Sequence, residues 1–239
     1  MFSVTGFDWV FFDCFNTLID DFDPTGDESG LGTLPDFAVT RGYCSTRSEF
    51  VTAYHQRRSE PELPGQETPL DERLRRTFRA MRPTEPLEEI AHKVAAMLER
   101  WDPEFLRSLR PTPGAMAVLT RWSERKKLGV VSNFFLPHYP LRYFRHFNLE
   151  HHFDFVLDSA AFGFKKPHPS IFQEAMNLAG MGPKDMARVL FIGDRLDLDI
   201  LPARDLGMQV LHFNRSKTRP DVAPTPSGIP VIYDWSEFA

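Results

Sequence analysis

Polar side chains that could perform chemistry stand directly after four apolar segments of the sequence. They are, in chain order, Asp13 with Thr17, Ser132 with Asn133, Lys166 before a proline, and Asp194 with Asp199. A carboxylate can attack an electrophilic centre, and a lysine, a hydroxyl and backbone N–H groups can neutralise the oxyanions that develop. Further carboxylates would repel the nucleophile unless a cation shared the site, and Mg²⁺ prefers oxygen ligands of this kind. These residue types therefore indicate a carboxylate nucleophile, an assisting lysine and Mg²⁺.

Short apolar segments lead into most of these side chains and are predicted to be β-strands. They span 9–13, 128–132, 155–158, 189–193 and 209–213, with a weaker one at 231–233. Nearly continuous apolar segments are typical of a parallel sheet that helices cover on both faces. Helical patterns at 113–125, 169–179 and 199–206 separate the strands, and the first is expected to have Thr112 as its N-cap. The alternation predicts an α/β fold with a doubly wound, Rossmann-like parallel sheet.

The segment after the first strand breaks this alternation. Helical patterns occupy 46–56, 68–81 and 84–101, and no strand is expected between residues 20 and 110. An arginine-rich run from Arg73 to Arg82 is expected to be the solvated side of one helix. The sequence thus predicts an α/β core of residues 1–20 and 110–239, and an inserted all-helical cap of residues 21–109. Inserted there, the cap would lie over the carboxyl ends of the strands, where open α/β sheets bind ligands.

Each group of polar residues also has an ordinary structural explanation when it is taken alone. An aspartate or serine can cap a turn, a lysine before a proline can be solvated, and acids favour a helix N-terminus. All four groups, however, fall at the carboxyl ends of predicted parallel strands. Because those ends meet at one edge of the sheet, the four groups are expected to form a single site.

The order and form of the four motifs resemble those of the haloacid dehalogenase superfamily of hydrolases. The motifs here are Asp13-Cys14-Phe15-Asn16-Thr17, Gly129-Val130-Val131-Ser132-Asn133, Lys166-Pro167, and Gly193-Asp194 through Asp199. The helical insert also stands where that family carries its first type of cap. The resemblance extends along the whole chain, is specific for the superfamily, and does not name a substrate.

The resemblance implies a role for each matching residue. Asp13 would attack and form a covalent aspartyl intermediate, and Thr17 would support the loop around it. Ser132 would hydrogen-bond the transferring group, and Lys166 would neutralise the charge of Asp13 and the substrate. The metal site implied for Mg²⁺ consists of Asp13, the backbone carbonyl of Phe15, Asp194, and Asp199 acting from behind the ligands or through water.

Phe15 departs from the pattern of the family's phosphatases. Those enzymes carry a second aspartate two residues after the nucleophile, which protonates the leaving alcohol, and phenylalanine cannot transfer a proton. The family's 2-haloacid dehalogenases have an aromatic residue at this position, and Asn133 after Ser132 resembles them as well. Asp194 and Asp199 instead favour a Mg²⁺-dependent phosphatase. Three functions stay open: a phosphatase weakened by Phe15, a 2-haloacid dehalogenase, and a family member that binds a ligand or partner without turnover.

Composition narrows the class of partner. A net charge of −5 and a pI near 5.9 give no basic surface for nucleic acid. No stretch approaches the roughly 20 apolar residues of a membrane span, so no membrane partner is expected. Two cysteines suit a reducing compartment and favour a cytoplasmic location. The expected partner is a small anionic substrate.

Overall fold

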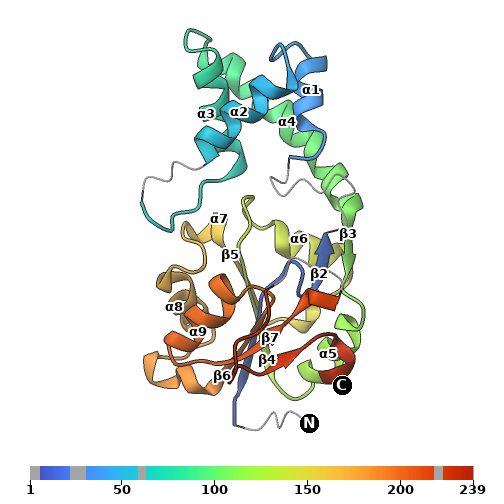
Figure 1. Ribbon diagram of the computed structural model, residues 1–239, viewed down its shortest axis with the longest axis vertical. Helices are drawn as coiled ribbons and strands as arrows, with labels where there is room; N and C mark the ends of the chain where they lie inside the picture. Colours follow the sequence, from blue (N-terminus) through green and yellow to red (C-terminus); the bar gives the residue numbers. More distant parts are fainter. Residues whose placement is uncertain (1–5, 22–30, 59–62, 218–222, 239) are drawn as a thin grey trace. The chain divides into compact units, whose positions relative to one another are not determined.

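A computed structural model describes residues 6–21, 31–58, 63–217 and 223–238 of the chain. The chain divides into two compact units, which Figure 1 shows as ribbons. The core unit consists of Met1–Asp20 and Arg110–Ala239, and the helical unit consists of Asp21–Leu109.

Six parallel strands form the sheet of the core unit. They are β1 (Trp9–Phe12), β4 (Lys127–Ser132), β5 (Phe155–Asp158), β6 (Val189–Gly193), β7 (Gln209–Phe213) and β8 (Val231–Ile232). Their order is β5-β4-β1-β6-β7-β8, so the first strand lies between β4 and β6. Phe12 is in register with Val130 on one side and Ile192 on the other, which brings the carboxyl ends of three strands to one level. The predicted doubly wound α/β fold is confirmed.

Helices cover both faces of this sheet. They are α5 (Ala115–Ser123), α6 (Tyr139–His146), α7 (Ser159–Phe162), α8 (Pro169–Leu178) and α9 (Leu201–Asp205), with shorter turns η1 (Glu150–His152), η2 (Pro183–Arg188), η3 (Leu196–Ile200), η4 (Arg215–Lys217) and η5 (Trp235–Phe238). Helices α8 and α9 lie on one side of the strands, and α5 and α6 lie on the other (Figure 1). Phe11, Phe172 and Phe191 belong to the core on the α8 side. Phe12 packs against Trp235 at 6.1 Å between ring centroids, and Trp235 is buried as well.

Two helix starts differ from the sequence prediction. Helix α5 follows Gly114, whose φ of 84° is left-handed, and not Thr112. The Thr112 hydroxyl instead donates to Asp20 Oδ1 at 3.1 Å, so a long-range partner takes the side chain that was expected to cap the helix. The helix predicted to begin at Asp199 begins earlier, as the π-helical turn η3, and continues as α9.

A two-stranded sheet appears where no strand was expected. It pairs β2 (Ile19–Asp21) with β3 (Leu109–Pro111), at the two points where the chain passes between the units. The prediction of no strand between residues 20 and 110 was wrong at both ends. Each strand has three residues, which is too short for an alternating pattern to be visible in the sequence.

The described part of the helical unit, residues 31–58 and 63–109 beyond Asp21, contains four helices. They are α1 (Leu34–Thr40), α2 (Arg47–Arg58), α3 (Leu70–Met81) and α4 (Leu87–Ser108). The apolar faces of α2 and α3 meet at Phe50 and Phe78, with 5.9 Å between ring centroids. Side-chain hydrogen bonds close the start of α2: Glu49 N–H donates to the Thr46 hydroxyl at 3.1 Å, and the Glu49 carboxylate accepts from Ser45 N–H at 2.8 Å. Helix α1 was not predicted.

The arginine-rich run of α3 is not entirely solvated. Arg73 is buried; its guanidinium donates to Glu67 Oε1 at 2.7 Å and to the Thr68 carbonyl at 2.6 Å. The side chains of Arg73 and Glu67 are 6% and 4% exposed, so both charges of this pair lie inside the unit. Periodicity could not identify this arginine because its partner lies in the preceding loop.

The buried pair predicts a large stability effect in the helical unit. Replacing Arg73 by methionine removes one partner of this buried ion pair, which typically costs about 3–5 kcal/mol. Hydrogen exchange of the α3 amides is expected to accelerate accordingly. Arg75→Met is the matched control on the same helix, because Arg75 is 41% exposed and its ion pair with Asp71 belongs to a class worth below about 1 kcal/mol. Equal acceleration in the two variants would contradict the prediction.

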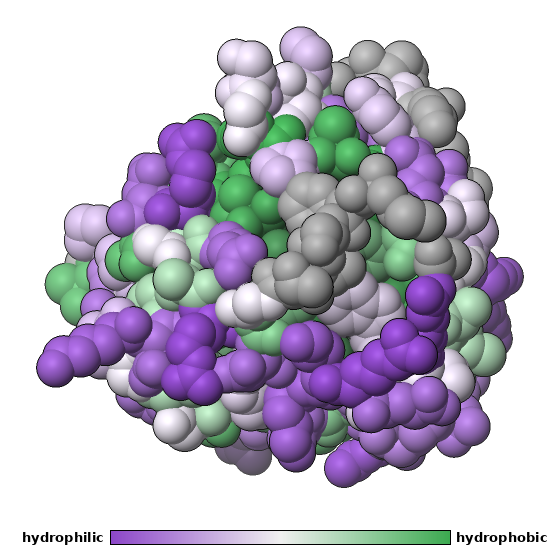
Figure 2. Space-filling model, turned by 90° about the horizontal axis from the view of Figure 1, so that it is seen from below, coloured by the Kyte–Doolittle hydropathy of each residue, from purple (hydrophilic) through white to green (hydrophobic). Residues whose placement is uncertain are grey.

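The surface of the molecule is mostly hydrophilic in the view of Figure 2, with a smaller hydrophobic area near its centre. The described chain contains no helix with the length and apolar character that crossing a bilayer requires. Both cysteines, Cys14 and Cys44, are free thiols and buried.

Candidate active site

Asp13 follows the last residue of β1 and is held from two sides. Its backbone N–H continues the sheet by donating to the Ile192 carbonyl at 2.8 Å. The Thr17 hydroxyl donates to Asp13 Oδ2 at 3.0 Å, and Lys166 Nζ donates to Asp13 Oδ1 at 2.7 Å. Each carboxylate oxygen therefore has a donor of its own, which fixes the orientation of a side chain that is 11% exposed.

Lys166 is the cation of the site. Its side chain is 1% exposed, and its ammonium contacts Asp13 Oδ1, Asp199 Oδ1 and the Val131 carbonyl, each at 2.7 Å. Burial alone would lower the pKa of Lys166, but the charges of Asp13 and Asp199 outweigh burial and raise the pKa above its usual value. Lys166 is therefore a fixed positive charge beside Asp13.

Asp199 reaches the site from the π-helical turn η3. Its Oδ2 accepts from Arg195 N–H at 3.0 Å, while its Oδ1 pairs with Lys166. Gly193 makes room for this arrangement, because a Cβ there would lie 2.6 Å from the Asp199 carboxyl carbon. Burial raises the pKa of Asp199 to about 6, although Lys166 acts in the opposite direction. With both oxygens occupied, Asp199 holds Lys166 and the loop after β6.

Of the three acids Asp13, Asp194 and Asp199, Asp194 is the one whose side chain makes no hydrogen bond or ion pair with a described residue. Carboxylate oxygens of Asp13, Asp194 and Asp199 lie within 4.8 Å of one another. Burial, followed by the charges of Asp13 and Asp199, raises the pKa of Asp194 well above its usual value. Three carboxylates around one ammonium leave an excess of negative charge, which a divalent cation would neutralise. The donor set, all hard oxygen, fits Mg²⁺.

Ser132 ends β4 beside this group, and its side chain is buried. Within the described ranges, Ser132 Oγ makes no hydrogen bond to a nitrogen or oxygen atom, and the thiol of Cys14 is its polar neighbour. Burial raises the pKa of Cys14 well above its usual value, and the charge of Asp13 adds to this effect. The thiol therefore stays protonated, and the Ser132 hydroxyl is available to an incoming group.

Asn133 has a different position from the other predicted site residues. Its amide forms two hydrogen bonds to one backbone residue: Lys166 N–H donates to Asn133 Oδ1 at 2.7 Å, and Asn133 Nδ2 donates to the Lys166 carbonyl at 2.8 Å. The amide thus fixes the backbone of Lys166 across two loops. The sequence suggested a catalytic role for Asn133 but did not indicate this contact.

Phe15 lies in the tight turn that follows Asp13. Asn16, with a φ of 59°, donates its N–H to the Ile19 carbonyl at 2.7 Å, and the backbone of Phe15 bridges to Ile19. The Phe15 ring stacks on Phe134 with 4.8 Å between ring centroids. An aromatic pair therefore occupies the flank of the site two residues after Asp13.

His212 is a polar residue of the site that sequence reasoning did not identify. It is fully buried on β7, its Nε2 lies 3.1 Å from the Asp194 carbonyl, and its Nδ1 lies 2.7 Å from Thr225 Oγ1. Burial lowers the pKa of His212, so the ring is neutral and can donate on one side and accept on the other. A histidine inside an apolar strand is the signal that could have been noticed.

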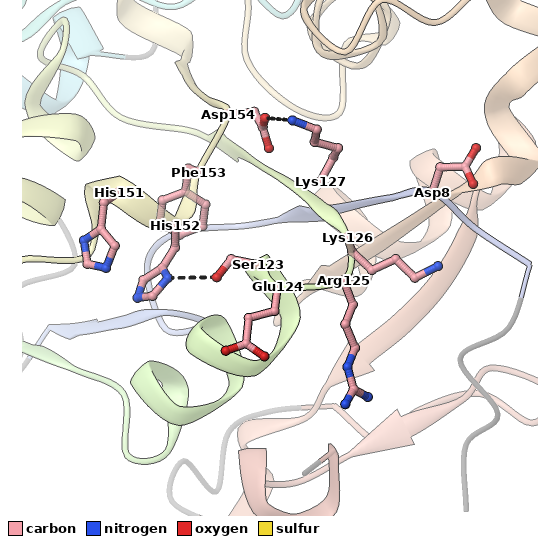
Figure 3. A pocket seen from close by; sticks show the side chains of 10 residues that line it. All are labelled: Asp8, Ser123, Glu124, Arg125, Lys126, Lys127, His151, His152, Phe153 and Asp154. Carbon is pink, nitrogen blue, oxygen red and sulfur yellow. Dashed lines mark hydrogen bonds and ion pairs between the residues drawn. The ribbon is translucent and has the colours of Figure 1, made fainter.

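A separate cavity of about 500 Å³ lies at the opposite, amino-terminal end of the strands. Its walls come from the residues before β1, β4 and β5, and Figure 3 labels them. Lys127 pairs with Asp154 at 2.7 Å, and the Ser123 hydroxyl lies 3.1 Å from His152 Nδ1 (Figure 3). The cavity holds none of the four predicted motifs, and its cationic and anionic side chains balance: Arg125, Lys126 and Lys127 against Asp8, Glu124 and Asp154.

Comparison with known proteins identifies the family of the chain. The model of the haloacid dehalogenase-like hydrolases matches residues 7–207, which is most of the chain. The chain belongs to the haloacid dehalogenase-like hydrolases. The family assignment made from the four motifs is therefore confirmed.

Individual proteins of known name share part of the sequence or the fold with this chain. A glyceraldehyde 3-phosphate phosphatase of Pyrococcus furiosus is 32% identical over 112 residues, covering 46% of this chain and 44% of that protein. A pyrimidine 5'-nucleotidase of Escherichia coli is 32% identical over 117 residues, covering 48% and 51%. The chain thus spans about half the length of these curated relatives. A 2-haloacid dehalogenase structure from Pseudomonas syringae has a TM-score of 0.73 at 20% identity, covering 97% and 96% of the two chains, and shares the fold.

Proposed function

We propose that this hydrolase removes the phosphate group from a small anionic compound, with Asp13 as nucleophile and Mg²⁺ as cofactor. The observation that supports the proposal best is the surroundings of Asp13. A carboxylate oriented by Thr17 and Lys166 lies within 4.8 Å of the unpaired carboxylate of Asp194. Relatives named as a glyceraldehyde 3-phosphate phosphatase and a pyrimidine 5'-nucleotidase, each matched over about half its length, support phosphate as the group removed.

Each residue has a distinct task in this proposal. An oxygen of Asp13 forms a bond to phosphorus as the bond to the leaving group breaks, and water then hydrolyses the aspartyl phosphate. Ser132 binds a phosphate oxygen, and the buried charge of Lys166 neutralises the charge of Asp13 and of the phosphate group. Asp13, Asp194 and the Phe15 carbonyl would hold Mg²⁺, which supplies charge neutralisation when bound. Asp199 keeps Lys166 aimed at Asp13, and Asn133 fixes the backbone of Lys166.

The missing acid restricts which phosphates react well. General acid catalysis typically contributes about 10²–10⁴ in rate, mostly by protonating a poor leaving group. Phe15 has no proton to give, and its ring is stacked on Phe134. Substrates whose leaving groups depart as stable anions are therefore the preferred ones. The helical unit is proposed to act as the cap that selects among them.

Magnesium binding tests the proposal apart from turnover. Titration of the protein with Mg²⁺ in a calorimeter is expected to give saturable binding, and phosphate release is expected to cease with EDTA and return with Mg²⁺. Asp194→Asn is expected to weaken Mg²⁺ binding at least about tenfold, because even residues that only orient metal ligands contribute 10–100-fold. Asp205→Asn is the control, since Asp205 is 70% exposed and pairs with Arg204. If Asp194→Asn bound Mg²⁺ as tightly as the wild type, Asp194 would not be a ligand of the metal.

Dehalogenation of 2-haloacids is the second candidate function, favoured by an aromatic residue at position 15 and by Asn133 after Ser132. A halide leaves without a proton, so Phe15 would be no handicap. Against this candidate, the Asn133 amide is bonded to the Lys166 backbone, and the three clustered carboxylates share only the charge of Lys166, which leaves an excess of negative charge. Chloride release from 2-chloropropionate in EDTA would establish the dehalogenase. Mg²⁺ binding without turnover of phosphates or haloacids would indicate a binding protein.

A further inference from the structure

Five aromatic side chains form a continuous cluster beside the proposed nucleophile, called here the aromatic cluster. They are Phe15, Phe134, Phe135, Tyr139 and Tyr143. The ring of Phe134 stacks on Phe15 at 4.8 Å and on Phe135 at 4.6 Å between centroids. Tyr143 meets Phe15 edge to face at 6.3 Å and Phe134 at 5.8 Å. These rings therefore behave as one packed unit.

The cluster lies at the same edge of the sheet as the site. Phe15 comes two residues after Asp13, at the end of β1, and Phe134 comes two residues after Ser132, at the end of the neighbouring strand β4. The Ser159 hydroxyl accepts a hydrogen bond from the Phe134 N–H at 2.9 Å and donates one to the Phe134 carbonyl at 3.1 Å. The position of the central ring is therefore fixed by the backbone as well as by stacking.

Part of the cluster is accessible. Phe134 and Tyr143 are buried, whereas Phe15, Phe135 and Tyr139 are half-buried. Buried rings thus support a partly exposed aromatic surface next to the residues that would receive the phosphate. Planar aromatic groups bind such surfaces by offset stacking or edge-to-face contact, which an alkyl group of similar size cannot reproduce.

We propose that this surface binds the leaving group and that the substrates are aryl phosphates, the phosphate esters of phenols. The inference rests on the proposed phosphatase function and adds the substrate class. Asp13 forms a bond to phosphorus while the bond from phosphorus to the aryl oxygen breaks, and its electron pair departs with the phenolate. Water then cleaves the aspartyl phosphate to inorganic phosphate, and the phenolate takes a proton from solvent. Aryl phosphates suit both the missing acid at position 15 and the aromatic cluster. Phenolate leaves without being protonated, and its ring can stack on the cluster.

Paired substrates separate stacking from leaving-group chemistry. Phenyl phosphate and hexafluoroisopropyl phosphate release hydroxyl compounds of similar acidity, but only phenyl phosphate has a ring. With Mg²⁺ present, kcat/KM is expected to be about three- to tenfold higher for phenyl phosphate, the range that aromatic contacts typically give. Equal values for the two substrates would overturn the inference and leave the phosphatase proposal intact.

Two variants locate the effect. Phe135→Leu keeps an apolar side chain but removes a partly exposed ring of the cluster. The variant is expected to lower kcat/KM for phenyl phosphate to about the value for the fluoroalkyl phosphate. Phe147→Leu is the matched control, because Phe147 is half-buried just after α6 and its ring contacts His146 instead of the cluster. An equal loss for both substrates in Phe135→Leu would assign the cluster to packing.

Binding without turnover provides the independent measurement. Phenylphosphonate and cyclohexylphosphonate carry the same phosphonate on rings of similar size, and neither has an ester bond to cleave. Calorimetry is expected to show tighter binding of phenylphosphonate, by about three- to tenfold, in the wild type and in Phe147→Leu but not in Phe135→Leu. If this preference is seen while neither phosphate ester is cleaved, the phosphatase proposal fails and the aromatic binding surface stands. Equal affinities of the wild type for the two phosphonates would overturn the proposal of an aromatic binding surface.

Discussion

Replacing Asp13 by asparagine is expected to lower phosphate release by more than about 10³, because the nucleophile that forms the covalent intermediate is lost. The substitution keeps the size and shape of the side chain. Lys166 also keeps its ion pair with Asp199 at 2.7 Å, so the variant is expected to fold. Phosphate release in steady state, with near-UV circular dichroism as the check on folding, measures the effect.

The same variant separates catalysis from binding. Asp13→Asn is expected to retain affinity for phenylphosphonate, because the Ser132 hydroxyl and the positive charge of Lys166 remain in place. Asp205→Asn, an aspartate-to-asparagine change at an exposed ion pair, is expected to leave both turnover and binding unchanged. Turnover of a folded Asp13→Asn protein within about tenfold of wild type would exclude Asp13 as nucleophile.

Restoring an acid at position 15 is expected to produce the largest gain. Phe15→Asp should raise the turnover of alkyl phosphates by about 10² or more, since general acid catalysis is typically worth about 10²–10⁴. Aryl phosphates should gain less, because phenolate leaves without a proton and the variant also loses the ring stacked on Phe134. The measurement is kcat/KM for a series of phosphate esters whose leaving groups differ in acidity. In Phe15→Asp, kcat/KM should depend less steeply on the acidity of the leaving group than in the wild type.

Phe15→Asn is the control for this gain. Asparagine matches aspartate in size and polarity and also removes the ring, but it has no carboxyl group to donate a proton. Phe15→Asn is therefore expected to remain as slow on alkyl phosphates as the wild type. If the Asp and Asn variants behave alike, proton supply is not what limits this site, and the turn around Phe15 serves another reaction.

Much of the core could be predicted from sequence because its signals are local. The strands at 155–158, 189–193 and 209–213 were predicted with the bounds that the structure has, since continuous apolar segments between turn residues indicate buried parallel strands. Elements that depend on distant partners were missed. The pair β2 and β3 is too short to carry a pattern, and the buried Arg73 could not be distinguished from the other arginines of α3.

The sequence by itself determined the family, the fold class and the residues that meet at the edge of the sheet, because strand ends and motif order can be read along the chain. Only the tertiary structure decided how these residues are paired. Lys166 bonds to Asp13 across 153 positions of sequence, and Asn133 holds the backbone of Lys166 across 33. Such contacts follow from the placement of β1 between β4 and β6, which no local pattern specifies. The same placement brings the ring of Phe15 against that of Phe134, so the position two residues after Asp13 contributes to an aromatic surface instead of an acidic group.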